Sequence, residues 1–145
     1  MCGAHAAVRH LLGGMMQASH PITIVDMEAG LEHLSRGTAR HVDTLIVMLE
    51  PYYKALETGR RAAELGREIG VKRVVAVANK LRDDTDAAAV RAFAAANGLP
   101  ILAEVPLDDR IRKADLTGGA AIDVPDSPAI AAIAALAAAL EPGPV

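Results

Sequence analysis

The stretch TLIVMLEPYYKALETGRRAAELGREIGVKRVVAVANK, residues 44–80, decides the fold. It begins with the uninterrupted apolar run 44–49 and closes with a second such run, 73–79. Runs of this kind are typical of strands that are buried on both faces of a parallel sheet. Between them, residues 52–69 have the length of a helix, which Glu50-Pro51 opens and Gly70 stops. The stretch therefore predicts a β-α-β unit, and its crossover is expected to be right-handed.

The rest of the chain extends this unit in both directions. Residues 22–25, after Pro21, are predicted as another buried strand, and residues 100–106 as a strand bracketed by prolines. Further helices are predicted over 3–16, 29–36, 84–96, 109–116 and 128–140. Strands that alternate with helices indicate a three-layer α/β domain with a mostly parallel, Rossmann-like sheet. We expect this single domain to span residues 1–141, with 142–145 as a loose tail.

Two of the predicted helices have informative faces. In helix 52–69, Gly59, Ala63 and Gly66 lie on about one face, and these small residues are expected to let the helix pack close to the sheet. In helix 128–140, which has no charged residue, the residues on one predicted stripe are Ile130, Ile133, Ala137 and Leu140. We expect this helix to pack on the core, with a contact to a partner as the alternative.

The composition limits the class of protein. With 145 residues, 52% of them hydrophobic and 23% charged, the chain is predicted to form one globular domain. Its net charge of -3 argues against a general nucleic-acid-binding surface. No apolar run approaches the roughly 20 residues of a membrane span. The single cysteine, Cys2, is typical of a reducing compartment. We therefore expect a cytoplasmic protein with no membrane span and no nucleic-acid partner.

Polar groups follow three of the four predicted strands. They are Asp26, then Asn79-Lys80, and then the segment 106–109. In open parallel sheets ligands bind beyond the carboxyl ends of the strands. A carboxylate such as Asp26 suits Mg²⁺, and an amide such as Asn79 can both donate to and accept from an adenine edge. Taken singly, Asp26 is more often a helix cap and Asn79 more often part of a turn, but together these groups favour a nucleotide site.

Three segments also resemble a known family. VDMEAGLEH (25–33), VVAVANK (74–80) and AEVPLDDRIRKADLTG (103–118) resemble the MinD/ParA-like P-loop ATPases. Within them they are most similar to the CooC-like ATPases associated with nickel insertion into carbon monoxide dehydrogenase. The resemblance covers almost the whole chain, but only the later half or more of that family's domain. It implies ATP/ADP and Mg²⁺ as cofactors, a homodimer, and a carbon monoxide dehydrogenase-type client enzyme.

The resemblance also implies roles for individual residues. Asp26 matches the Walker B aspartate, which holds Mg²⁺ through water, and Gly30 falls in the mobile switch II region. Asn79 matches the residue that reads adenine, with Lys80 beside it. The loop expected to close over the base matches residues 106–109, with Pro106, Leu107 and Asp108 as its predicted nucleotide-binding residues.

The opening MCGAHAAVR resembles the segment after a Cys-x-Cys pair, which binds metal across the dimer in this family. Here Cys2 takes the second cysteine position, and the first would precede Met1. Cys2 and His5 are spaced as C-x-x-H and are candidate ligands of Ni or Zn at a dimer interface. Without the resemblance, a surface thiol and solvated histidines are the likelier interpretation of this spacing.

The phosphate-binding loop G-x-x-x-x-G-K-[ST] is absent from the sequence. No Gly-Lys pair occurs in the 145 residues, and the pairs Gly13-Gly14 and Gly118-Gly119 are followed by Met and Ala. Backbone amides of that loop and its lysine bind the phosphates. The chain as written is therefore not expected to hydrolyse ATP alone. Either the sequence begins late in a longer protein, or the protein is a naturally shortened relative.

In the family, the phosphate-binding loop follows a central strand next to the Walker B strand. We therefore expect either a gap in the sheet or direct pairing of 22–25 with 44–49. Three functions stay open: a CooC-like nickel-insertion ATPase, a MinD/ParA-like ATPase with another client, and a non-catalytic interaction module that retains the fold.

Overall fold

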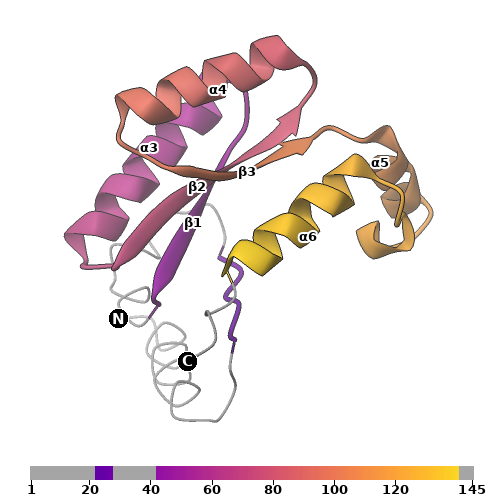
Figure 1. The fold of residues 1–145 in the computed structure, drawn as a ribbon, viewed down its shortest axis with the longest axis horizontal. Coiled ribbons are helices and arrows are strands. Elements are labelled where there is room, and N and C mark those ends of the chain that lie inside the picture. The colour runs from indigo at the N-terminus through magenta and orange to yellow at the C-terminus, as the bar shows by residue number, and fades with distance from the viewer. Residues whose placement is uncertain (1–21, 28–41, 141–145) are drawn as a thin grey trace, which may run out of the picture.

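The structure, a computed structural model, describes residues 22–27 and 42–140 (Figure 1). The predicted helices 3–16 and 29–36 and the tail 142–145 lie outside the described residues. So do three predicted site residues, Cys2, His5 and Gly30.

The described part alternates strands and helices as predicted. The strands are β1 (Thr44–Leu49), β2 (Arg73–Leu81) and β3 (Ile101–Pro106), and the helices are α3 (Tyr53–Glu68), α4 (Asp84–Ala96), α5 (Asp109–Leu116) and α6 (Pro128–Leu140), with a short 3-10 turn, η2, at Ala121–Asp123. The three strands form one parallel sheet in the order β1-β2-β3. The bounds differ from the predicted ones by two residues at most, apart from the unpredicted turn.

Helices cover both faces of this sheet. Figure 1 shows α3 and α4 on one face and α6 on the other. Alternate residues of each strand divide between the two layers, as the pleat of a strand requires. Val47 and Leu49 point into the α3 and α4 layer, whereas Val77 and Val105 pack with Ala129 of α6. The predicted three-layer α/β architecture is confirmed.

Helix α3 lies close to β1 because of its small residues. Gly59, Ala63 and Gly66 are its buried residues, as the sequence predicts. A Cβ atom added to Gly66 would lie 2.5 Å from Leu45 Cδ2, and one added to Gly59 would overlap Leu49. The prediction that these residues permit close packing is confirmed.

Helix α6 packs on β3 with a face other than the predicted one. Ala129 is buried, and Ala132 and Leu136 pack beside it, whereas Ile133 is 45% exposed. The predicted stripe through Ile133 is therefore wrong. Ala129 and Ala132 permit a closer approach to the strand than isoleucine does, and the helix turns the face with these alanines and Leu136 inward. Contact with the core is confirmed, but most of the helix surface is exposed.

The prediction of a strand at residues 22–25 is wrong for this structure. These residues are not part of the sheet, Ile24 is 89% exposed, and β1 pairs only with β2 within the described chain. The next residue after Asp26, Met27, packs against Val71, which precedes β2. The expected direct pairing of 22–25 with 44–49 does not occur. An apolar run forms a strand only where another strand offers its backbone, and no described strand pairs with this one.

Most basic side chains between residues 60 and 73 are bonded within the chain. Arg60 pairs with Glu57 and Glu64, and Lys72 Nζ lies 3.4 Å from Asp43 Oδ1. The hydrogen bond from Arg60 lowers the pKa of Glu57 to about 2. This arrangement is typical of a solvated, internally paired face.

Candidate functional site

The structure brings two of the three predicted polar groups together at the carboxyl edge of the sheet. Asn79 and Lys80 lie at the end of β2, and the segment 106–108 follows β3, its parallel neighbour. The backbone N–H of Leu107 donates to the carbonyl of Leu81 over 2.8 Å. This hydrogen bond joins the two segments directly, and together they form the candidate site.

Asn79 and Lys80 form a β-bulge. Ala78 pairs with Glu104 and Leu81 pairs with Pro106, so β2 uses three residue steps where β3 uses two. Residues in a bulge leave the regular ladder, and bulges are frequent next to active sites because they redirect side chains. Asn79 is half-buried there, and no hydrogen bond to its side-chain amide is found among the described residues. Its donor and acceptor are therefore free, within that part of the chain, to meet a ligand.

Lys80 has an unusual backbone conformation. Its φ of 57° lies in the left-handed region, and it is the one residue other than glycine with positive φ in the described chain. Such a conformation is uncommon for a residue with a long side chain. Lys80 Nζ lies 2.8 Å from Glu50 Oε1, at the end of β1. The hydrogen bond that Lys80 donates to the Glu50 carboxylate raises the pKa of Lys80 above its usual value.

Within the loop after β3, Asp108 is bonded inside the chain. Its carboxylate accepts from the backbone N–H of Arg110 and so caps α5, and it pairs with Arg110 Nη2 at 2.7 Å. Hydrogen bonds from Arg110 and from the buried Ser127 hold the pKa of Asp108 well below its usual value. Pro106 closes β3, and Leu107 is 45% exposed beside it. This loop therefore offers Leu107 and its backbone, not a free carboxylate.

Asp26 lies away from this edge. It is exposed, and its neighbour Met27 packs with Val42 and Val71, which precede the strands and so lie at the amino edge of the sheet. In the described part of the chain, no three His, Cys, Asp or Glu side chains are grouped so that they could hold a metal ion. These residues therefore do not fit a Mg²⁺ site in the present arrangement.

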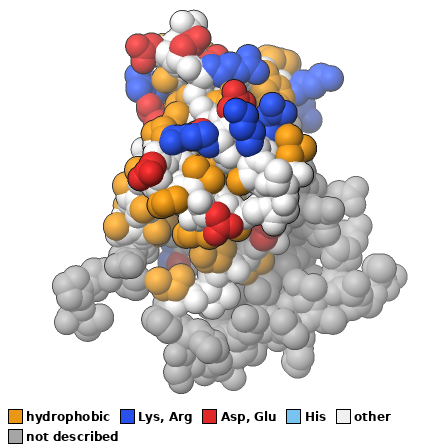
Figure 2. Space-filling view, turned by 90° about the vertical axis from the view of Figure 1, so that its right-hand side faces the viewer, with side chains coloured by type: hydrophobic (Ala, Val, Ile, Leu, Met, Phe, Trp, Pro, Cys, Tyr) orange, Lys and Arg blue, Asp and Glu red, His pale blue; other side chains and the backbone are white. Residues whose placement is uncertain are grey.

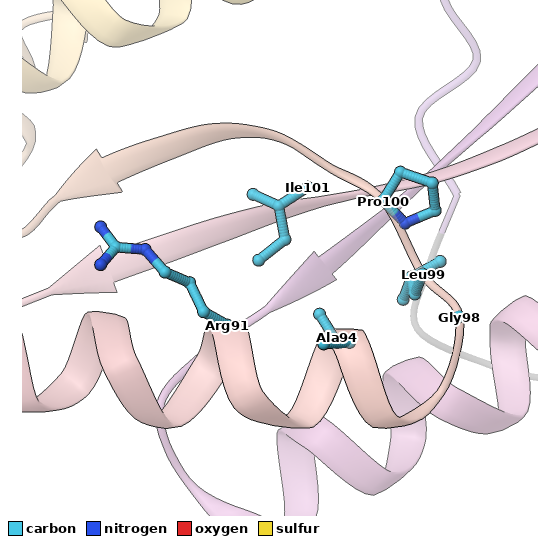
Figure 3. A pocket seen from close by; sticks show the side chains of 7 residues that line it. Arg91, Ala94, Gly98, Leu99, Pro100 and Ile101 are labelled. Atoms are coloured by element: carbon cyan, nitrogen blue, oxygen red, sulfur yellow. The ribbon is translucent and has the colours of Figure 1, made fainter.

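A shallow pocket of about 410 Å³ lies elsewhere. Figure 3 shows it between α4 and the start of β3, with Arg91 at one end and Leu99, Pro100 and Ile101 along the other. Its lining is mostly apolar, and Arg91 is bonded to Glu104 through two hydrogen bonds of 2.5 Å. It lies at the amino end of β3, away from Asn79, and contains none of the predicted site residues.

The surface near α5 and α6 carries charges of both signs. Figure 2, which views the right-hand side of Figure 1, shows Lys and Arg side chains among carboxylates and apolar groups.

No described helix has both the length and the apolar character needed to cross a membrane.

Comparisons with known proteins agree with this fold. No family model matches the chain. The sequence is 34% identical over 141 residues to the carbon monoxide dehydrogenase accessory protein CooC of Rhodospirillum rubrum, which covers 97% of this chain and 53% of that protein. It is 31% identical to an uncharacterized ATP-binding protein of Methanocaldococcus jannaschii, over 81% of this chain and 46% of that protein. The chain thus spans about half the length of these relatives.

Solved structures show the same fold at lower identity. The MinD cell division protein of Aquifex aeolicus matches 74% of this chain and 48% of its own, with a TM-score of 0.63 and 14% identity. The MinC:MinD complex from the same organism matches with a TM-score of 0.64 and 16% identity, over 82% of this chain and 50% of the other. By fold and sequence the chain is a relative of the MinD/ParA-like P-loop ATPases. Within that class it is close to CooC.

The sequence alone predicts Glu50 only as the end of a strand and the start of a helix, whereas the structure pairs it with Lys80. A signal was present in the sequence. Glu50 directly follows the first strand of the β-α-β unit and Lys80 lies near the end of the second, so parallel pairing places the two charges side by side.

Proposed function

We propose that this chain is the nucleotide-binding, C-terminal portion of a CooC-like ATPase that matures the metallocentre of a carbon monoxide dehydrogenase-type enzyme by nickel insertion. The observation that carries the proposal is the carboxyl edge of the sheet, where the Asn79–Lys80 bulge lies beside the 106–108 loop. The sequence similarity to CooC covers 97% of this chain. The relatives named as ATP-binding support a nucleotide as the ligand.

The described residues fit the base better than the phosphates. The amide of Asn79 has a donor and an acceptor, as an adenine edge requires. Leu107, whose backbone N–H bonds to Leu81, offers an exposed apolar surface at the same edge of the sheet. ATP, when bound, would supply the energy source and the signal for assembly of a homodimer, and ADP would be the nucleotide that remains after hydrolysis. Phosphate binding needs a loop with Gly-Lys, which we propose comes from a preceding part of a longer protein. The chain alone would then bind nucleotide weakly and would not hydrolyse it.

Asp26 and Gly30 would take their Walker B and switch II roles in that longer protein. For this, the segment 22–27 has to join the sheet and bring Asp26 to the carboxyl edge. Cys2 and His5 would then belong to a Ni or Zn site shared by two subunits.

Calorimetry with Mg-ATP tests nucleotide binding. We expect the wild-type chain to bind and Asn79→Ala to weaken binding by about tenfold, because a bidentate hydrogen bond to the base is lost. Asn97→Ala is the matched control, since Asn97 is the other asparagine of the chain. It follows α4 and precedes β3, and so lies near the amino edge of the sheet, away from Asn79. Equal affinity of the wild type and Asn79→Ala would contradict the proposed base contact.

Metal titration separates the CooC-like function from a MinD/ParA-like ATPase with another client. The first predicts stoichiometric Ni²⁺ or Zn²⁺ binding that is lost in Cys2→Ser, and the second predicts no dependence on Cys2. Absence of both nucleotide and metal binding would favour the third candidate, a non-catalytic interaction module.

A further inference from the structure

We propose that Glu50 is a positioning residue of the nucleotide site: it holds the β2 bulge through Lys80 and so fixes the direction of the Asn79 amide. This inference rests on the proposed function, and it assigns a role to a residue outside the predicted site.

The register of the sheet places Glu50 at the bulge. Leu49, the last residue of β1, pairs with Ala78, so Glu50 and Asn79 follow at the same level of two adjacent strands. The Glu50 side chain is only 24% exposed, and its Oε1 lies 2.8 Å from Lys80 Nζ. A single ion pair therefore connects the end of β1 to the residue that follows Asn79.

The conformation of Lys80 needs such a contact. A lysine with a φ of 57° is in an unfavourable region, and such conformations persist only where the surroundings hold them. On one side the bulge is closed by the Leu107–Leu81 hydrogen bond, and on the other by the Lys80–Glu50 pair. When the pair is removed, Lys80 can relax toward a regular strand conformation. Asn79 would then turn with it, because the two residues share a peptide bond.

The pair's position distinguishes it from the other ion pairs of the chain. Arg60 and Glu64 pair along one exposed helix face, where such contacts contribute little. The Glu50–Lys80 pair joins two strands at the edge where the candidate site lies. Its effect is therefore expected on ligand binding more than on the free energy of unfolding.

The test compares Glu50→Gln with the wild type in titrations followed by ¹⁵N NMR of the full chain. Glu50→Gln keeps the shape of the side chain but removes its charge. We expect it to weaken Mg-ATP binding by about tenfold, since small misplacements of a binding group are costly. Mg-tripolyphosphate, which has no base, is expected to bind only weakly to either protein and with no difference between them, because the chain lacks the phosphate-binding loop. The amide signals of Asn79 and Lys80 are expected to move in Glu50→Gln without any ligand.

Two further variants control for stability and charge. Glu64→Gln removes a paired carboxylate far from the bulge and should bind Mg-ATP like the wild type. Glu50→Asp keeps the charge on a shorter side chain, and we expect an intermediate loss of affinity with an unchanged urea midpoint. If Glu50→Gln binds Mg-ATP as tightly as Glu64→Gln does, the inference is overturned while the proposed function stands. If the wild type binds no Mg-ATP, the proposed function fails and the inference fails with it.

Discussion

Asp108 is committed to structure although it lies within the candidate site. It caps α5 and pairs with Arg110, and its side chain is only 8% exposed. A carboxylate bonded in this way has little capacity left for a ligand. At the residue scale, we therefore expect Leu107 and the loop backbone to contact a base, and Asp108 to hold the loop in shape.

The lowered pKa of Asp108 predicts how stability changes with pH. Because the pKa is lower in the folded chain than the usual value of about 4, the ionised carboxylate stabilises the fold above that pH. This stabilisation is lost as the pH falls below about 4. Asp108→Asn keeps a good helix cap but loses the charge. In urea unfolding we expect the wild type to exceed Asp108→Asn in stability at pH 7, with an advantage that begins to shrink below about pH 4 and is smaller at pH 3. A difference that stays constant over this range would contradict the assignment.

Removal of the Ser127 hydroxyl is expected to lower the free energy of unfolding, because this hydroxyl caps α6. The buried hydroxyl accepts from the backbone N–H of Ala129 at 3.2 Å. Ser127→Ala should lower the free energy of unfolding by about 1–2 kcal/mol. Thr85→Ala, at an exposed position of α4, is the control and should change it by less than about 0.5 kcal/mol. Equal urea midpoints for the two variants would contradict the capping role.

At the element scale, the sequence predicts strands well where pairing is local. The apolar runs of β1, β2 and β3 are joined by single helices, so each strand's neighbour is supplied by the next unit along the chain. Residues 22–25 have the same apolar character, yet they form no strand because no described strand pairs with them. The bulge at Asn79–Lys80 was not predictable either, since it depends on the register between β2 and β3.

The close packing of α3 on β1 gives a prediction for Gly59. Alanine is favoured over glycine in a helix by about 1 kcal/mol. A Cβ atom at Gly59, however, would overlap Leu49, which is fully buried and has little room to move. Overpacking of this kind typically costs about 1–3 kcal/mol, so Gly59→Ala should destabilise the chain by about 1 kcal/mol net.

The neighbouring residue provides the control for that substitution. Thr58 is exposed on the same helix, and Thr58→Ala should be neutral or slightly stabilising in a urea titration. A gain in stability from Gly59→Ala similar to that from Thr58→Ala would show that α3 does not lie as close to β1 as described.

At the scale of the whole molecule, the chain is about half as long as CooC, and β1 is an edge strand of the described sheet. If the chain acts as part of a longer ATPase, a preceding part should supply a strand that pairs along β1. We expect hydrogen exchange at β1 to slow markedly when the chain is joined behind the first half of a CooC protein. Residues 22–25 should become protected at the same time. Unchanged exchange in both segments would contradict the proposed relation to the longer protein.

The central claim is that the carboxyl edge of this sheet binds the base of a nucleotide. The most direct measurement is ¹⁵N NMR of the chain during titration with Mg-ATP. We predict that the amides of Asn79, Lys80, Leu107 and Asp108 shift and saturate together, while those of Gly98, Leu99 and Ile101 at the opposite pocket do not move. Shifts confined to that pocket, or none at saturating nucleotide, would contradict the account.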